Sequence, residues 1–213
     1  MKDCKQKWWK DAALGMFVHW GLYSMLGGVW NGRRTDNVSE WIMRHLEIPV
    51  ESYRALAASF CPENFNARQW VQLAADSGMK YLVYTAKHHD GFAMYHSKCS
   101  KYNIVDATPF GRDPLEELAE ACAMAGIKLG VYYSQAQDWD EPNGLGYGKP
   151  DSEKNYAQYY HDKCLPQLRE LLTQYGSLGL MWFDTPMSMT AEQSRGIYDL
   201  VKALQPDCIV SGR

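Results

Sequence analysis

Gly179-Leu180-Met181-Trp182-Phe183-Asp184-Thr185-Pro186 is the stretch that decides the fold class of this chain. It reads as a buried strand that ends in a carboxylate and is stopped by the proline. Because side chains alternate along a strand, Trp182 and Asp184 are predicted to lie on one face and Met181 and Phe183 on the other. Parallel α/β folds build their sites at the carboxyl ends of strands. Asp184 is therefore a candidate site residue, with a simple turn residue as the alternative.

Four more strands are predicted around this one, separated by helical patterns. The strands cover residues 15–21, 80–86, 128–134 and 207–213, and the helices cover 50–60, 66–78, 115–125, 152–175 and 191–204. Strands that alternate with helices indicate right-handed βαβ units and a parallel sheet. Polar and aromatic residues gather just after each strand. This asymmetry favours a (β/α)8 TIM-barrel-like fold, which uses one rim for its chemistry.

The number of strands falls short of that fold. A (β/α)8 barrel has eight strands and about 250 residues, whereas this sequence has 213 residues and five predicted strands. We therefore expect residues 1–213 to be a partial (β/α)8 domain, truncated after about five strands. A dinucleotide-binding sheet is not favoured, because no G-x-G-x-x-G follows the first strand.

The composition is that of a globular protein without a surface for nucleic acid. The chain is 46% hydrophobic and 22% charged, with a formal net charge of -3. No run of Lys and Arg is interleaved with aromatic residues, so no phosphate-binding surface is predicted. The sequence shows neither an apolar run of about 18 residues nor a signal-peptide pattern, so we expect a cytoplasmic protein without a membrane span. Its 8 Trp and 14 Tyr suit the apolar faces of sugars, although such rings also fill cores.

The six cysteines indicate neither a disulfide framework nor a zinc site. None forms a C-x-x-C pair, and Cys122 and Cys164 fall within helical patterns. Buried free thiols are the expectation.

Histidines follow two of the predicted strands. His19 ends the first strand within Phe-Val-His-Trp-Gly, and His88, His89 and Asp90 follow the second. Adjacent histidines cannot both point inward from a regular strand, but a turn at the rim lets both reach one site. Metal ligands usually stand at i,i+2 on strands or i,i+4 on helices, so imidazoles that bond to hydroxyl groups are preferred to a metal site. We predict no metal and no cofactor.

Other polar residues are less specific on their own. Glu40 and Trp41 offer a hydrogen-bond acceptor next to a stacking surface, or a solvated acid before a core ring. Asp138, Asp140 and Glu141 fall in a loop rich in glycine and proline, and we interpret them as solvated acids.

Taken together, these stretches resemble the retaining α-L-fucosidases of glycoside hydrolase family 29. The blocks that match in order and spacing are Gly15-Met16-Phe17-Val18-His19-Trp20-Gly21, Ser39-Glu40-Trp41, Thr85-Ala86-Lys87-His88-His89-Asp90-Gly91-Phe92, Tyr132-Tyr133-Ser134 and Leu180-Met181-Trp182-Phe183-Asp184. The similarity extends over nearly all 213 residues. It implies a (β/α)8-like barrel, which in the family is usually followed by a β-sandwich. It also implies hydrolysis of terminal α-linked L-fucose from oligosaccharides or glycoconjugates, with retained configuration.

The resemblance implies a role for each candidate residue. Asp184 would be the nucleophile that attacks the anomeric carbon and forms a covalent fucosyl-enzyme. Tyr133 is chosen over Tyr132 for the fucose pocket, since alternation allows only one of them to face inward. Trp182 and Phe92 are expected to form an apolar wall for the methyl group of fucose. The complete predicted pocket is His19, Glu40, Trp41, His88, His89, Tyr133, Trp182 and Arg213.

The sequence departs from the family's pattern at its end. Retaining hydrolysis needs two carboxyl groups about 5–5.5 Å apart, and the family's acid/base Glu comes after the fifth strand, where this sequence ends. The remaining barrel strands and the β-sandwich have no counterpart either. We therefore expect a fragment of a longer gene, a barrel completed by another copy of the chain in a homo-oligomer, or a degenerate relative. Glu40 is the nearest substitute acid within the chain.

Two other functions remain open at this point. One is a non-catalytic fucose-binding relative that lacks the acid/base residue, and the other is a metal-dependent hydrolase on a barrel. An activated fucosyl fluoride distinguishes the first from a fucosidase, because only an enzyme forms a covalent adduct with it. Loss of activity with a chelator would identify the second.

Overall fold

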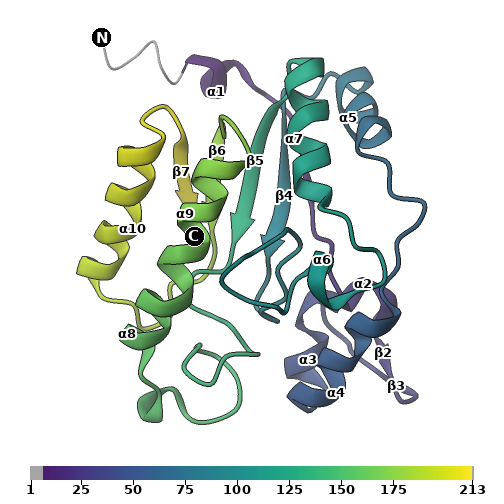
Figure 1. The fold of residues 1–213 in the computed structure, drawn as a ribbon, viewed down its shortest axis with the longest axis vertical. Coiled ribbons are helices and arrows are strands. Elements are labelled where there is room, and N and C mark those ends of the chain that lie inside the picture. Colours follow the sequence, from purple (N-terminus) through teal and green to yellow (C-terminus); the bar gives the residue numbers. More distant parts are fainter. Residues whose placement is uncertain (1–6, 213) are drawn as a thin grey trace.

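The computed structural model describes residues 7–212, which form a parallel five-stranded sheet with helices. The strands are β1 (Gly15–Val18), β4 (Tyr81–Lys87), β5 (Lys128–Tyr133), β6 (Leu180–Phe183) and β7 (Ile209–Gly212), paired in the order β1-β4-β5-β6-β7. All of these pairings are parallel. Figure 1 shows the strand arrows pointing in one direction, with helices in front of them. The predicted α/β class with five parallel strands is confirmed.

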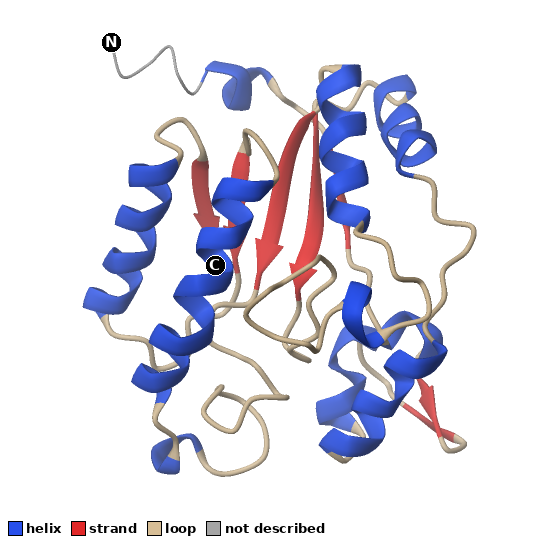
Figure 2. Cartoon of the chain, in the orientation of Figure 1, coloured by secondary structure: helices blue, strands red, loops and turns tan. Residues whose placement is uncertain are grey.

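The longer helices cover one face of the sheet. They are α5 (Ala67–Asp76), α7 (Pro114–Ala125), α9 (Leu165–Gln174) and α10 (Ala191–Leu204) (Figure 2). Thr190 and Gln193 exchange side-chain-to-backbone hydrogen bonds and so fix the start of α10. Helix α7 ends at Gly126, whose φ of 70° is left-handed backbone that glycine adopts without strain. The predicted limits of α7 and α10 are confirmed to within one residue.

The shorter elements gather mainly at the carboxyl ends of the strands. They are α2 (Tyr23–Leu26), β2 (Val29–Trp30), β3 (Arg33–Arg34), α3 (Ile42–His45), α4 (Val50–Arg54), α6 (Ile104–Ala107) and three 3-10 helices (Ser39–Trp41, Ala55–Ser59 and Asp151–Glu153). In Figure 1, α2 to α4 and the β2–β3 hairpin lie below the sheet, on the side to which the strand arrows point. The loops that follow the strands therefore meet these elements at one edge.

The predicted helix over 152–175 is interrupted in the structure. It comprises α8 (Tyr156–Tyr159), a π-helical turn (Tyr160–Cys164) and then α9. Pro166 lies in the first turn of α9 and has no N–H to donate four residues back, which disturbs the regular ladder at this point. The wider turn places Lys163 inside the protein, where it is 5% exposed.

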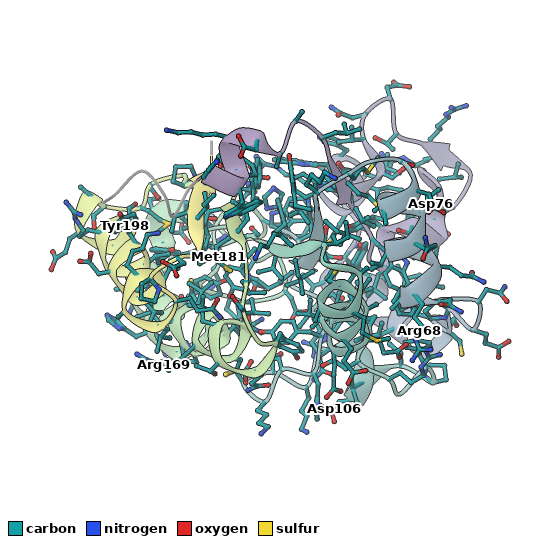
Figure 3. The ribbon with its side chains drawn as sticks, turned by 90° about the horizontal axis from the view of Figure 1, so that it is seen from above. Arg68, Asp76, Asp106, Arg169, Met181 and Tyr198 are labelled. Carbon is teal, nitrogen blue, oxygen red and sulfur yellow. The ribbon has the colours of Figure 1, made fainter. Side chains whose placement is uncertain are left out.

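Two apolar layers lie on opposite faces of the sheet. Met181 and Phe183 belong to the large core between the sheet and the long helices. Leu180 and Trp182 lie on the other face, where the indole of Trp8 from α1 (Lys7–Asp11) packs against the same layer. Figure 3 shows Met181 among the side chains in the middle of the molecule, whereas the labelled Arg68, Arg169 and Tyr198 lie toward its rim. The predicted alternation along β6 is confirmed.

The structure also bears on two further expectations, the membrane span and the state of the cysteines. No helix among residues 7–212 is long and apolar enough to cross a bilayer. Cys122, Cys164 and Cys208 are buried free thiols, while the free thiols Cys61 and Cys99 are exposed. The expectation for Cys122 and Cys164 is confirmed, and the remaining cysteine, at position 4, lies outside the described residues.

Candidate active site

Asp184 directly follows β6, and its buried carboxylate is surrounded by hydrogen-bond donors. The residue is 3% exposed. Tyr132 donates its hydroxyl hydrogen to Oδ2 over 2.8 Å, and the backbone N–H of Thr185 donates to Oδ1 over 2.8 Å. His89 Nε2 lies 3.3 Å from Oδ2. Donors on both oxygens favour the ionised carboxylate, because a buried negative charge is stable only when its lone pairs are satisfied.

Strand β5 presents Tyr132, not Tyr133, to Asp184. The β5–β6 register pairs Tyr132 with Trp182, so both share the face from which Asp184 projects. Tyr133 points to the helices on the other face and donates its hydroxyl hydrogen to Gln167 Oε1 over 2.8 Å. The prediction that Tyr133 lies in the site was wrong. Alternation along one strand does not give the register with its neighbour, and a slip of one residue exchanges the two faces.

Both residues of the His88-His89 pair reach the site because β4 ends irregularly. Its ladder with β5 shifts register just before the pair. The two ring centroids lie 4.3 Å apart, and the His88 ring stacks on Tyr132 with 8° between the planes. Burial, together with the neighbouring His89 and His19, lowers the pKa of His88 well below its usual value. The His88 imidazole is therefore neutral at pH 7.

His19, Glu40 and Trp41 reach the same edge from other elements. His19 follows β1, and its ring centroid lies 5.5 Å from that of His88. Glu40 belongs to the 3-10 helix Ser39–Trp41. A ring nitrogen of His19, a carboxylate oxygen of Glu40 and a ring nitrogen of His88 all lie within 4.8 Å of one another. Trp41 packs edge-on against His89, with centroids 5.0 Å apart. Arg213, which the resemblance also implies, lies outside the described residues.

Trp182 forms an aromatic wall of the site, but Phe92 does not. The Trp182 indole stacks on Tyr132 at 5.4 Å between centroids, and Tyr132 stacks on His88 at 5.1 Å. Phe92 is 1% exposed and packs against Tyr102 in the large core. The prediction that Phe92 joins Trp182 in this wall was wrong, because the turn after the histidine pair directs Phe92 into the core. Of the predicted pocket residues that the structure describes, Tyr133 alone is absent from this edge.

The loop after β5 carries a buried ion-pair network instead of a solvated acid. Asp138 is 0% exposed and accepts from the ammonium groups of Lys87 and Lys163, each at 3.0 Å. Lys87 also donates to the Tyr159 hydroxyl over 2.6 Å. Burial by itself would raise the pKa of Asp138, but the two ammonium groups outweigh it and lower this pKa to about 2. The interpretation of Asp138 as a solvated acid was wrong.

The other two acids of this loop differ from each other. Asp140 lies 3.3 Å from the Arg54 guanidinium, and only 5% of its side chain is exposed. Burial and the neighbouring Asp138 raise the pKa of Asp140 to about 6. Glu141 lies 3.1 Å from Lys163 with 37% of its side chain exposed. The prediction of a solvated acid therefore fits Glu141 and not Asp140.

Polar residues just after β5 and β6 support the site and were not predicted. Gln135 Oε1 accepts the backbone N–H of Asp184 over 3.0 Å. Ser134 Oγ lies 2.7 Å from His89 Nδ1, and Gln137 donates to the Thr185 hydroxyl over 3.2 Å. Their place directly after strand ends is a signal that sequence analysis could have used. Serine and glutamine are common in loops, however, so the residue types alone do not single them out.

Two groups of side chains are close enough to hold a metal ion. They are His19, Glu40 and His88, and His88, His89 and Asp184, each with donor atoms within 4.8 Å of one another. His88 belongs to both groups, and its buried Nδ1 has no hydrogen-bond partner among the described residues. Asp90 is in neither group and accepts from the Tyr53 hydroxyl over 2.9 Å. The absence of a metal and a cofactor stays a prediction.

An alpha-L-fucosidase family profile matches residues 2–213 of the chain. The chain belongs to the alpha-L-fucosidase family. Among solved fucosidase structures, AlfC from Lactobacillus casei in complex with its alpha-L-fucose product is 45% identical, with a TM-score of 0.93 over 97% of this chain and 68% of that one. The alpha-L-fucosidase from Vibrio sp. strain EJY3 is 40% identical, with a TM-score of 0.92 over 98% of this chain and 38% of that one. Alpha-L-fucosidase 1 of Arabidopsis thaliana is 32% identical over 99% of this chain.

Membership of the alpha-L-fucosidase family agrees with the resemblance that the sequence motifs indicate. The likeness to AlfC also confirms the predicted fold class, a barrel-type α/β domain represented by five strands. The chain spans 37–40% of the length of the curated fucosidases that it matches.

Proposed function

We propose that the protein releases terminal α-linked L-fucose from glycans by retaining hydrolysis, with Asp184 as the nucleophile. The observation that carries the proposal is the Asp184 carboxylate at the carboxyl end of β6, with donors on both oxygens. A buried carboxylate that is ionised and held in place can attack an anomeric carbon, and water then hydrolyses the resulting ester. Relatives support the choice of sugar. Structures of AlfC and a variant of it contain alpha-L-fucose and Fucα(1,6)GlcNAc, respectively.

The surrounding residues suit recognition of a small sugar. His88 Nδ1 is buried without a hydrogen-bond partner in the described part of the chain, a state that costs free energy unless a ligand supplies the missing bond. A sugar hydroxyl between His19, Glu40 and His88 supplies this hydrogen bond, because the ring nitrogens and the carboxylate oxygen of these residues lie within 4.8 Å of one another. The indole faces of Trp41 and Trp182 offer apolar surface to the carbon-bound hydrogens and the methyl group of fucose.

Covalent labelling with 2-deoxy-2-fluoro-α-L-fucosyl fluoride tests the proposal. Fluoride leaves with little help from an acid, so the formation of the adduct depends on the nucleophile and not on the acid/base residue. We expect intact-mass spectrometry to show one added fluorofucosyl group on the protein that carries this chain, and none on Asp184→Asn. A folded protein that binds fucose but is never labelled would instead be the non-catalytic fucose-binding relative.

Tyr132→Phe should slow the reaction, whereas Tyr133→Phe should not. The first change removes the hydroxyl that donates to Asp184 over 2.8 Å. A hydrogen bond to a charged group contributes about 1.5–3 kcal/mol, so kcat/KM for an activated aryl fucoside should fall roughly 10- to 150-fold. The matched change at Tyr133 removes a bond to Gln167 on the other face of the sheet and should affect stability alone. A loss of activity in Tyr133→Phe but not in Tyr132→Phe would mean that Tyr133 faces the site, and it would contradict the β5–β6 register.

A further inference from the structure

His89 lies between two partners that together determine where its hydrogens are. The residue is 0% exposed. Its Nδ1 lies 2.7 Å from Ser134 Oγ, and its Nε2 lies 3.3 Å from Asp184 Oδ2. A neutral imidazole carries a hydrogen on one nitrogen only, whereas an imidazolium carries one on each. Whether the partner of each nitrogen accepts or donates a hydrogen bond shows which form is present.

Ser134 requires a hydrogen on Nδ1 of His89. A serine hydroxyl has one hydrogen, and Ser134 donates it to the backbone carbonyl of Gln137 over 2.8 Å. A carbonyl oxygen can only accept, so this donation cannot be reversed. Ser134 Oγ can therefore meet Nδ1 only as an acceptor, and Nδ1 must be the donor.

Asp184 requires a hydrogen on Nε2 as well. If Nδ1 carried the only hydrogen, the lone pair of Nε2 would face the lone pairs of a buried carboxylate at 3.3 Å. The contact is favourable only when a hydrogen lies between the two atoms. The carboxylate already accepts from Tyr132 and from the backbone of Thr185, and such bonds favour the negative charge on Asp184. The hydrogen therefore belongs to Nε2, and His89 is an imidazolium.

Among the described residues, Gln137 also lies near Nε2. Its amide orientation is set by Trp139, whose indole N–H donates to Oε1 over 3.2 Å. The amide nitrogen therefore faces the site, where it donates to Thr185 and lies 3.5 Å from His89 Nε2. That distance exceeds the 3.3 Å between His89 Nε2 and Asp184 Oδ2. The ion pair with Asp184 is shorter and charge-assisted, so it determines the hydrogen on Nε2.

The surroundings of His89 accommodate one positive charge. Among the described residues, the titratable groups around His89 include Asp184, His88 and, at the end of β4, the Lys87–Asp138 pair. His88 is neutral because its pKa is well below the usual value, so it does not repel the charge. The charge of Lys87 is matched by Asp138 at 3.0 Å. Trp41 and Trp139 pack against the ring and do not titrate.

We infer that Ser134 is a positioning residue, which holds one hydrogen on Nδ1 of His89 and thereby makes His89 an imidazolium paired with the Asp184 carboxylate. Its catalytic meaning rests on the proposed role of Asp184. The carboxylate loses its negative charge when it bonds to the anomeric carbon and regains it when water breaks that bond. A fixed positive charge at Oδ2 keeps the attacking group ionised and stabilises it again as the leaving group.

Nitrogen NMR of the unmodified protein tests the inference without reference to turnover. Histidine labelled with ¹⁵N is introduced into the protein that carries this chain, and the His89 signals are identified by their loss in His89→Gln. We expect both ring nitrogens of His89 to show the shifts of protonated nitrogen at pH 7. An unprotonated nitrogen in this ring would overturn the inference, whatever the result of the labelling with the fucosyl fluoride.

Ser134→Ala separates positioning from general stability. Without the serine acceptor, His89 is free to take the neutral form that donates from Nε2 to Asp184, so the Nδ1 signal should become that of an unprotonated nitrogen. We expect kcat to fall roughly 10- to 100-fold with little change in KM, because the positive charge that stabilises the Asp184 carboxylate is lost. Ser97→Ala is the matched control, since Ser97 is equally buried but bonds to Glu170 in the core. Unchanged His89 signals in Ser134→Ala would contradict the proposed role.

Discussion

Asp184→Gly is expected to lower the turnover of an activated aryl α-L-fucoside by about a thousandfold or more, as removal of a covalent nucleophile does in other enzymes. The pocket should remain, because Tyr132 and His89 are held by other contacts as well, through stacking on Trp182 and the bond to Ser134. Release of the phenolate under saturating substrate measures the loss. Full turnover in this variant would place the nucleophile elsewhere in the chain.

Azide should restore part of the activity of Asp184→Gly. The missing carboxylate leaves space beside the anomeric carbon, and a small anion can attack from that side in one displacement. The product should be a fucosyl azide of inverted configuration, which proton NMR identifies from the coupling at the anomeric carbon. Asp184→Asn is the control, because its amide fills the space and should show the same loss without rescue. A rescued product of retained configuration would contradict attack from the Asp184 side.

Asp138→Ala is expected to destabilise the fold by about 3–5 kcal/mol, the usual cost of leaving buried charges without their partner. Asp138 forms ion pairs with two ammonium groups at 3.0 Å, those of Lys87 and Lys163. Urea denaturation measures the free energy of unfolding. Glu141→Ala is the matched control, since Glu141 pairs with the same Lys163 but is 37% exposed, and its loss should cost less than about 1 kcal/mol. Equal losses in the two variants would mean that burial does not govern this network.

The same network gives the protein an acid-sensitive stability. The pKa of Asp138 is about 2 in the folded chain, below the ordinary aspartate value of 3.8. A lowered carboxyl pKa stabilises the fold at pH values above the unfolded pKa, and this contribution is lost as the pH falls from about 4 toward 2. The difference corresponds to roughly 2–3 kcal/mol. Unfolding free energies measured from pH 5 to pH 2 should therefore fall less in Asp138→Ala than in the unmodified protein.

Local patterns in the sequence predict most of the architecture. Alternation along residues 180–184 places Trp182 and Asp184 on one face, and capping residues set the limits of α7 and α10. These features depend on neighbours within a few residues, so a single sequence contains the information.

Pairings between distant segments account for the wrong predictions. One partner of Asp138, Lys87, stands 51 residues away, so a loop acid could not be recognised as buried. Tyr132 and Tyr133 are equivalent until the β5–β6 register is known. The role of Ser134 likewise depends on the turn after β4, which brings His89 to it from 45 residues away.

The order of the strands in the sheet has a consequence for how the chain is made. From β1 through β4, β5 and β6 to β7, each strand pairs with the sheet strand that precedes it in the sequence. A ribosome delivers the chain from its amino terminus, and folding units form as they emerge. After β1, each described strand of this sheet finds its first neighbour already made when it emerges. The sheet can therefore grow by one strand at a time during synthesis, and Asp184 meets Tyr132 and His89 only when β6 joins strands that are already in place.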